Sequence, residues 1–544
     1  MISRTFSVGS DAMRYERSRD WGSATLDQYL RVRAREQPDT PAVVDRGTRY
    51  SYRELDKLVA KTGSLLTQRG ISAADVVAWQ MPNRVEALTL HHAIIRAGAI
   101  SVPIIPIYRQ REVEFILRQS GAVAYFAPET FRGFSFGEMI GEMVPRLPSL
   151  RTVALHGNDG WDARAAGPGG NGDPVPASPA RRHMASDVVV ILYTSGTTAD
   201  PKGALHTHQT LDYENRSIID LWGVGPEDVV FMPSPITHVT GLLYGMQLPF
   251  MVGACVVLQD VWNVGVAIDL IETNKCTLLV GATPFLQGIV NHPDRMSRDL
   301  SSLRVAACGG ADVPPELIRR FEAETGAMTC RIYGSTEFPT LSGASSADPM
   351  GKRAETDGRP IGSAQARIAG KAATEVSGAM AGALQVRGPE LFAGYLDASL
   401  NGDAFDDGWF RTGDLAIIDR DGYVTIVGRE KDIIIRGGEN ISAREIEDLL
   451  FNHPLIADVA VVAMPDDVMV ERACAYLVLT EGAQLTVEEL AAYLDGFRIA
   501  KQKWPERVEI VTALPRTPSG KVQKFLLRKD VGERLAAEKA RTRS

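Results

Sequence analysis

A segment rich in hydroxyl side chains and glycine follows an apolar run and ends in a lysine. It reads Tyr193-Thr-Ser-Gly-Thr-Thr-Ala-Asp-Pro-Lys-Gly203 and comes directly after the β-branched run Val188 to Ile191. Backbone N–H groups and hydroxyls in such a loop can donate hydrogen bonds to a polyphosphate, and Lys202 can supply a positive charge. The segment is not a Walker A loop, because Pro201 precedes the lysine and a glycine follows it. Taken alone, it also fits an ordinary solvated turn.

Four further motifs that combine glycine with acidic, basic and hydroxyl side chains follow along the chain. They are Tyr333-Gly-Ser-Thr-Glu337, Trp409-Phe-Arg-Thr-Gly-Asp414, Gly428-Arg-Glu-Lys-Asp432 and Pro518-Ser-Gly-Lys521. Each is only moderately specific by itself. In this order, and over about residues 25 to 530, the set resembles the adenylate-forming superfamily of acyl-CoA synthetases, peptide-synthetase adenylation domains and luciferases.

The resemblance implies an ATP- and Mg²⁺-dependent acid:CoA ligase, which adenylates a carboxylic acid with release of pyrophosphate and then forms the acyl-CoA thioester with CoA. Joining a carboxylate to the α-phosphate of ATP brings two anions together, so the site needs cations and hydrogen-bond donors aimed at the developing charge. By resemblance, Lys521 is the catalytic lysine that bridges the carboxylate and the phosphates. Thr336 contacts the α-phosphate through its hydroxyl, and Glu337 is the Mg²⁺ ligand, since a hard carboxylate usually binds this ion together with phosphates.

The resemblance also assigns the residues that hold the nucleotide. Asp414 corresponds to the carboxylate that accepts hydrogen bonds from both ribose hydroxyls, and Arg429 to an arginine that contacts ribose and phosphate. Without the family context these residues would be an ordinary turn aspartate and half of a surface ion pair. The complete ATP- and AMP-binding set is Thr194, Ser195, Gly196, Thr197, Thr198, Lys202, Gly309, Gly310, Tyr333, Gly334, Asp414 and Arg429.

Other positions carried over concern the acyl group and CoA. His238 corresponds to a gating position between the ATP side and the carboxylate pocket and is counted with the catalytic residues; a hydrogen-bonded core histidine is the alternative. Val239 disfavours an α-amino acid as substrate, because relatives that activate amino acids usually place an aspartate near this point. Gly437 and Gly438 leave room for the pantetheine arm of CoA, and Lys431 falls at the hinge between two poses of the small domain.

The acid itself is weakly specified by the sequence. The stretch from Arg96 to Arg132 resembles ligases of the cyclohexanecarboxylate-type and medium-chain group, which favours an alicyclic, aromatic or medium-chain acid. Ala199 stands where the family usually has glycine, and a positive φ at that position would strain the loop by about 1 kcal/mol. Its effect on the reaction rate is left open.

Three alternatives to a CoA ligase remain at this stage. The adenylate could be transferred to the phosphopantetheine of a carrier protein, or the enzyme could be a diazotase that activates nitrite in a biosynthetic pathway. A nucleotide-binding sensor that keeps the fold without catalysis is disfavoured, because Lys521, Glu337, Asp414 and Arg429 are all present.

The elements that must position these residues follow from apolar periodicity. Residues 25–155 alternate helix-like segments with short apolar runs, which predicts parallel strands joined by crossover helices. The segment after residue 431 is long enough for a small α+β domain, with a helix predicted from Ser442 to Phe451. We therefore predict an α/β domain over residues 1–430, with sheets flanked by helices and, by resemblance, a distorted barrel. A small mobile α+β domain is predicted over residues 431–544.

Composition excludes several classes of function. The 544 residues carry a formal net charge of −8, so no chain-wide positive field exists to bind nucleic acid. The five scattered cysteines argue against a zinc site or a disulfide scaffold. The first thirty residues lack a secretory signal, which predicts a cytoplasmic protein. Residues 229–259 are apolar, but prolines and glycines interrupt them, so no membrane span is expected. The oligomeric state is open, and a dimer is compatible with the sequence.

Overall fold

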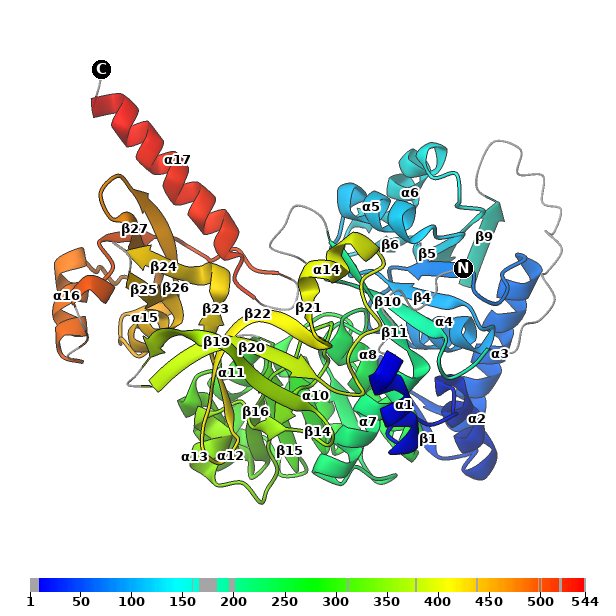
Figure 1. Cartoon of the computed structure of the whole chain (residues 1–544). Coiled ribbons are helices and arrows are strands. Elements are labelled where there is room, and N and C mark those ends of the chain that lie inside the picture. Colours follow the sequence, from blue (N-terminus) through cyan, green and yellow to red (C-terminus); the bar gives the residue numbers. More distant parts are fainter. Residues whose placement is uncertain are drawn as a thin grey trace. The chain divides into compact units, whose positions relative to one another are not determined.

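The computed structural model divides the chain into two compact units (Figure 1). It describes residues 9–158, 160–165, 183–194, 201–310, 313–376, 379–436, 439–497, 499, 501–517 and 521–542. The first unit consists of Met1–Ala354, Ile361–Ala364 and Arg387–Asp403. The second consists of Glu355–Pro360, Gln365–Val386 and Ala404–Ser544. The compact units thus do not divide at residue 430, because the strands just before that residue pack with the C-terminal part of the chain. The prediction that a small mobile domain begins after residue 430 and pivots there stays a prediction.

Two seven-stranded sheets form the centre of the first unit. In the first sheet β2 pairs antiparallel with β1, and the described ladders between the other strands are parallel. Its strands are, in spatial order, β16 (Met328–Ile332), β15 (Val305–Gly309), β14 (Leu278–Gly281), β12 (Val229–Met232), β13 (Cys255–Leu258), β1 (Pro41–Asp45) and β2 (Thr48–Ser51).

The second sheet has a parallel centre and an antiparallel strand at each edge. In spatial order it contains β11 (Lys202–Thr207), β10 (Val188–Thr194), β4 (Ile100–Pro103), β3 (Val76–Trp79), β5 (Ala124–Pro128), β8 (Thr152–Gly157) and β9 (Gly160–Ala165). This arrangement confirms the predicted parallel strands with crossover helices.

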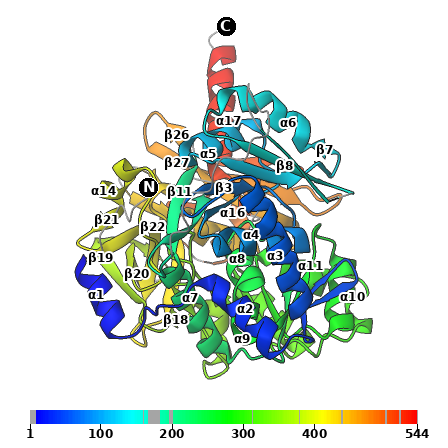
Figure 2. The same cartoon turned by 90° about the vertical axis from the view of Figure 1, so that its right-hand side faces the viewer.

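Helices cover the sheets and fill the space between them. The helix α4 (Val85–Arg96) is buried at Val85 and from Ala87 to Ile95, as expected of a helix packed between layers. It lies beside α3 (Tyr52–Gln68), which begins at a capping box formed by Ser51 and Glu54 (Figure 2). The remaining described α-helices of this unit are α1 (Gly9–Arg17), α2 (Leu26–Glu36), α5 (Gln110–Ser120), α6 (Phe136–Met143), α7 (His208–Trp222), α8 (Val239–Met246), α9 (Leu248–Val252), α10 (Val264–Asn274), α11 (Thr283–Asn291), α12 (Pro315–Thr325), α13 (Met350–Glu355) and α14 (Asn401–Ala404).

The second unit contains two five-stranded sheets. The first contains β19 (Gln365–Val376), β20 (Ala379–Arg387), β22 (Trp409–Ile418), β21 (Phe405–Asp406) and β23 (Val424–Arg429). The second contains β25 (Glu439–Ser442), β24 (Ile433–Arg436), β27 (Val470–Leu479), β26 (Ile456–Asp466) and β28 (Arg507–Ile510). Its helices are α15 (Ala443–Leu450), α16 (Val487–Asp495) and α17 (Lys524–Thr542). Ser442 caps α15 by accepting the Glu445 N–H at 3.3 Å, which confirms the helix start predicted there.

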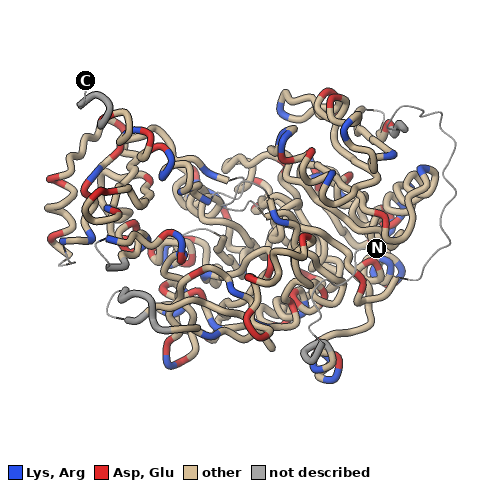
Figure 3. The backbone as a smooth tube through the Cα atoms, turned by 45° about the horizontal axis from the view of Figure 1, so that its top comes forward, with Lys and Arg blue, Asp and Glu red and all other residues tan. Residues whose placement is uncertain are grey.

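Among the described residues, Lys and Arg are interspersed with Asp and Glu along the backbone of each unit (Figure 3). The C-terminal helix α17 carries several cations that pair within the second unit. Lys524 contacts Glu447 at 2.7 Å, and Arg534 contacts Glu509 at 2.8 Å. These cations therefore have carboxylate partners within the second unit.

Candidate active site

The Tyr333–Glu337 motif forms a closed loop at the carboxyl end of β16. Tyr333 and Ser342 exchange two backbone hydrogen bonds, of 3.1 and 3.2 Å, at the base of this loop. The Ser335 N–H donates to the Phe338 carbonyl at 2.8 Å, which tightens the turn. A side chain at Gly334 would collide with the backbone of Pro339, so only glycine fits there. The carboxyl ends of parallel strands are where open α/β sheets usually bind ligands.

Thr336 and Glu337 are held at the turn of this loop by neighbouring segments. His206 Nε2 donates to the Thr336 carbonyl at 2.8 Å, and burial lowers the pKa of His206 to about 4, so the imidazole stays neutral. The Phe392 N–H donates to the Glu337 carbonyl at 2.9 Å. The Tyr395 hydroxyl donates to Glu337 Oε1 at 2.7 Å. These bonds fix both the main chain and the carboxylate of the predicted metal ligand.

Thr194 and Lys202 flank the predicted phosphate-binding loop. They are partners in the antiparallel pairing of β10 with β11, so the two ends of the loop lie side by side. The Lys202 ammonium lies 5.3 Å from the centre of the Tyr395 ring. The predicted loop residues Ser195, Gly196, Thr197 and Thr198, together with Ala199, lie outside the described residues.

Gly309 and Gly310 lie next to the Tyr333 loop. Gly309 is the last residue of β15 and pairs with Ile332, the residue before Tyr333. Gly310 has a φ of +77°, a conformation that favours glycine. Cys308, just before them, is buried, and burial raises the pKa of its thiol to about 12, which disfavours the thiolate form. The structure therefore brings Thr336, Glu337 and Lys202 together in the first unit. The predicted nucleotide-binding glycines Gly309, Gly310 and Gly334 lie in the same unit.

His238 caps α8 at its N-terminus. Its Nδ1 accepts the Thr240 N–H at 3.4 Å, and its side chain is half-buried. Val239, which follows it on the predicted acyl side, is buried. The geometry leaves both sequence-based interpretations of His238 in place, because a capping histidine at the edge of the core can also face a substrate.

Two buried carboxyl groups that the sequence analysis missed lie behind the Tyr333 loop. The Tyr244 hydroxyl donates to Glu214 Oε1 at 3.0 Å, and the Thr340 N–H donates to Glu214 Oε2 at 3.2 Å. Burial raises the pKa of Glu214 to about 7. Burial, with a further contribution from Glu214, raises the pKa of Glu390 well above its ordinary value. Glu214 follows Leu211 at helical spacing on α7, and an acidic residue on that apolar stripe was the available indication of a buried carboxyl.

In the second unit, β22 and β23 bring Asp414 and Arg429 together. The two residues are partners in the antiparallel register, and Arg429 Nε lies 3.1 Å from Asp414 Oδ1. The Asp414 side chain is buried, whereas 42% of the Arg429 side chain is exposed. Two residues assigned separately from their motifs thus form one carboxylate and guanidinium pair, which suits sugar and phosphate recognition.

The predicted hinge and catalytic lysine also lie in the second unit. Lys431 is in a short 3₁₀ turn, Glu430–Asp432, and Arg528 donates to its carbonyl at 2.8 Å. The Lys521 N–H donates to Thr517 Oγ1 at 3.1 Å, and residues 518–520 lie outside the described part of the chain. Gly437 and Gly438, the predicted CoA-channel residues, also lie outside it.

The donor set suits magnesium held jointly with a substrate. Within the described residues, no group of three or more His, Cys, Asp or Glu side chains could hold a metal ion. Glu337 Oε2 accepts no hydrogen bond from any described residue, so one carboxylate oxygen is available. Mg²⁺ is commonly bound through one or two carboxylates, substrate phosphates and water, and Glu337 fits that mode of binding.

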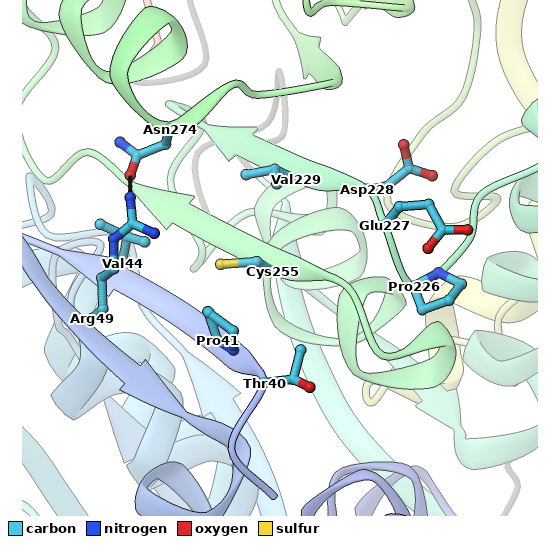
Figure 4. A pocket seen from close by; sticks show the side chains of 10 residues that line it. All are labelled: Thr40, Pro41, Val44, Arg49, Pro226, Glu227, Asp228, Val229, Cys255 and Asn274. Carbon is cyan, nitrogen blue, oxygen red and sulfur yellow. Dashed lines mark hydrogen bonds between the residues drawn. The ribbon is translucent and has the colours of Figure 1, made fainter. Parts of the chain in front are cut away.

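A surface pocket of about 170 Å³ lies at the amino ends of β1, β12 and β13, whereas the motif loops of this sheet follow the carboxyl ends of β15 and β16 (Figure 4). Arg49 in this pocket donates to Asn274 Oδ1 at 3.0 Å, and burial raises the pKa of the Cys255 thiol to about 12. The pocket therefore presents neither a nucleophile nor the predicted nucleotide-binding residues.

Among the described helices, none is both long and apolar enough to cross a membrane. The apolar stretch 229–259 forms short strands and helices.

Comparisons with known proteins agree with this geometry. Residues 30–396 match the family model for AMP-binding enzymes, and residues 445–521 match that for the C-terminal domain of AMP-binding enzymes. The chain is 36% identical over 528 residues to the medium-chain fatty-acid–CoA ligase of Escherichia coli (strain K12), which covers 95% of this chain and 92% of the relative. It is 30% identical over 543 residues to the 2,3-dihydroxybenzoate-AMP ligase of Bacillus subtilis (strain 168), with 97% of each chain covered.

A solved structure supports the fold. The ATP-bound crystal structure of MatB from Rhodopseudomonas palustris superposes with a TM-score of 0.80 at 27% identity, covering 93% of this chain and 99% of that chain. The predicted fold class, a large α/β part followed by a smaller C-terminal domain, is confirmed. The chain therefore belongs to the AMP-binding enzyme family, as an ATP-using, AMP-forming acyl-CoA synthetase.

Proposed function

We propose that this enzyme activates a medium-chain, alicyclic or aromatic carboxylic acid and transfers the acyl group to CoA. The observation that carries the proposal is that Glu337, in the loop after β16, and Lys202, at the start of β11, both contact the side chain of Tyr395. A site for a nucleoside triphosphate requires two charged groups, a carboxylate that binds the metal ion and a cation that binds the phosphates. The similarity to a medium-chain fatty-acid–CoA ligase supports the choice of acid.

In the first half-reaction, the acid carboxylate attacks the α-phosphate of ATP and pyrophosphate leaves. Glu337 would hold Mg²⁺, which would supply neutralisation of the phosphate charge. Lys202 and the Thr336 hydroxyl bind phosphate oxygens, and Lys521 neutralises charge that develops between the two reacting anions. Asp414 and Arg429 bind the ribose. These roles are proposals that the arrangement inside each unit supports.

In the second half-reaction, the CoA thiolate attacks the acyl carbonyl and AMP leaves. Lys431 acts as the pivot that exchanges Lys521 for the segment containing Gly437 and Gly438, and these glycines let the pantetheine arm pass close to the backbone. We infer that residues 431–544 move as one body about this pivot. A cytoplasmic location and a dimeric state are compatible with the fold and complete the proposal.

A carrier-protein acceptor is the second candidate, because the chain is also similar to a relative that is named for an adenylate and not for a CoA thioester, the 2,3-dihydroxybenzoate-AMP ligase. The experiment that separates the two measures product formation from ATP, Mg²⁺ and a panel of aliphatic, alicyclic and aromatic acids. CoA, a holo-carrier protein and nitrite are supplied in turn as the second substrate. We expect acyl-CoA from one class of acid only. Pyrophosphate release without any acyl-CoA product would contradict the ligase proposal, and product only with the carrier or with nitrite would identify the alternative acceptor.

A further inference from the structure

Tyr395 was not predicted as a site residue, yet its side chain contacts both of the charged residues on which the proposed function depends. It lies in the segment Arg387–Asp403 of the first unit, and only 5% of its surface is exposed. Its hydroxyl donates to Glu337 Oε1 at 2.7 Å, and its ring faces the Lys202 ammonium at 5.3 Å. The second distance is within the range of a cation–π interaction.

The main chain holds Tyr395 firmly in this position. Its N–H donates to Asn401 Oδ1 at 2.8 Å, and its backbone pairs with Ala204 on β11, the strand that begins at Lys202. Its ring packs against Phe392 with ring centres 4.8 Å apart, and the Phe392 N–H binds the Glu337 carbonyl. Tyr395 is therefore fixed to the same two segments that its side chain bridges.

Each contact has a consequence for the charges. The hydroxyl binds Oε1 of Glu337 and leaves Oε2 without a partner among the described residues, which fixes the rotation of the carboxylate and directs one oxygen away from the tyrosine. The ring holds Lys202 by its face, and within the described part of the chain no ion pair joins Lys202 to Glu337. If these opposite charges paired directly, each would be partly neutralised before ATP and a metal ion bind.

We propose that Tyr395 is a positioning residue for adenylation, whose hydroxyl orients Glu337 toward Mg²⁺ and whose ring keeps Lys202 apart from that carboxylate and available to phosphate. This inference rests on the proposed roles of Glu337 and Lys202. The two parts of the side chain have separate roles, because the hydroxyl orients the metal ligand Glu337 and the ring positions the phosphate-binding Lys202. A tyrosine with a purely structural role would not separate these two effects.

The test measures ATP binding to the full-length protein by calorimetry, with Mg²⁺ and with EDTA, for Tyr395→Phe and Tyr395→Leu. We expect Tyr395→Phe to weaken Mg²⁺-ATP binding by about tenfold, the size of effect that loss of one hydrogen bond to a charged group can produce, and to leave metal-free ATP binding unchanged. Tyr395→Leu, which also removes the ring, should weaken binding under both conditions. The Mg²⁺ concentration that gives half-maximal acid-dependent ATP–pyrophosphate exchange should rise in parallel for Tyr395→Phe.

Two control variants distinguish a wrong inference about Tyr395 from a wrong role for Glu337. Tyr29→Phe removes a similar hydroxyl, which donates to Asp212 at 2.5 Å on another part of the first unit, and should bind Mg²⁺-ATP like the wild type. Glu337→Gln tests the proposed metal ligand directly. If Glu337→Gln loses the Mg²⁺-dependent part of binding but Tyr395→Phe does not, the inference about Tyr395 is wrong and the proposed function stands. If Glu337→Gln also binds like the wild type, the proposed role of Glu337 is wrong and the inference is overturned with it.

Discussion

Replacing Glu214 by glutamine should change how the stability of the protein depends on pH. Burial raises the pKa of Glu214 from its ordinary value of 4.5 to about 7 in the folded protein. Below pH 4.5 the carboxyl is protonated in both the folded and the unfolded chain. As the pH rises from 4.5 to 7, the unfolded chain ionises first, so the folded state loses stability.

The magnitude follows from the size of the pKa change. Each unit of difference between the folded and the unfolded pKa corresponds to about 1.36 kcal/mol. The wild-type protein should therefore lose about 3 kcal/mol of unfolding free energy through this group by pH 8. Glutamine cannot ionise. Its amide can accept from Thr340 and donate to Tyr244, so the packing is retained. Relative to wild type, Glu214→Gln should therefore gain up to about 3 kcal/mol between pH 5 and pH 8.

Urea denaturation of both proteins at pH 5 and pH 8 measures this difference. Glu142→Gln, the same substitution at an exposed position on α6, serves as the matched control. Glu390→Gln should act in the same direction as Glu214→Gln, because burial also raises the pKa of Glu390. Parallel pH dependence of wild type and Glu214→Gln would refute the reasoning, since it would mean that this carboxyl ionises equally in the folded and the unfolded chain.

Three further outcomes are expected. Gly334→Ala should reduce acid-dependent pyrophosphate release by more than about tenfold, because its side chain would collide with the Pro339 carbonyl and displace Thr336 and Glu337; unchanged release would contradict the loop geometry. Asp414→Asn should raise the KM for ATP by about tenfold with a smaller effect on KM for the acid, as measured by initial rates, and an equal effect on both would count against a ribose-binding role. Arg353→Leu should lower the unfolding free energy by about 3 kcal/mol in urea titrations, because it leaves the Glu322 carboxylate without its bidentate partner; a loss below about 0.5 kcal/mol would show that the pair contributes little.

The elements with strong periodicity could be predicted from the sequence. The helix-like run that includes Arg84 to Ala97 became α4, and the apolar run at Val188 became β10, because burial on several sides leaves a plain apolar pattern. The order of the motifs was enough to predict the family. The local sequence was therefore sufficient to predict the fold class and the general chemistry.

The partners of the site residues could not be predicted, because they depend on long-range register. Asp414 and Arg429 were assigned from separate motifs, and only the antiparallel pairing of β22 with β23 shows that they form one pair. Tyr395 contacts Glu337 across 58 residues, and Glu214 contacts Thr340 across 126 residues. No local pattern encodes such distances along the chain, so the residues that hold the motif loop in place emerge only from the fold.

The central claim is that Glu337 and Lys202 form the phosphate and metal end of an adenylating site. Acid-dependent ATP–pyrophosphate exchange, measured without CoA for the wild type, Glu337→Gln and Lys202→Ala, tests it most directly. The account predicts exchange with the wild type that requires Mg²⁺, and a loss of at least about a hundredfold in each variant while the folded state is retained. Exchange at wild-type rate in either variant would contradict the claim.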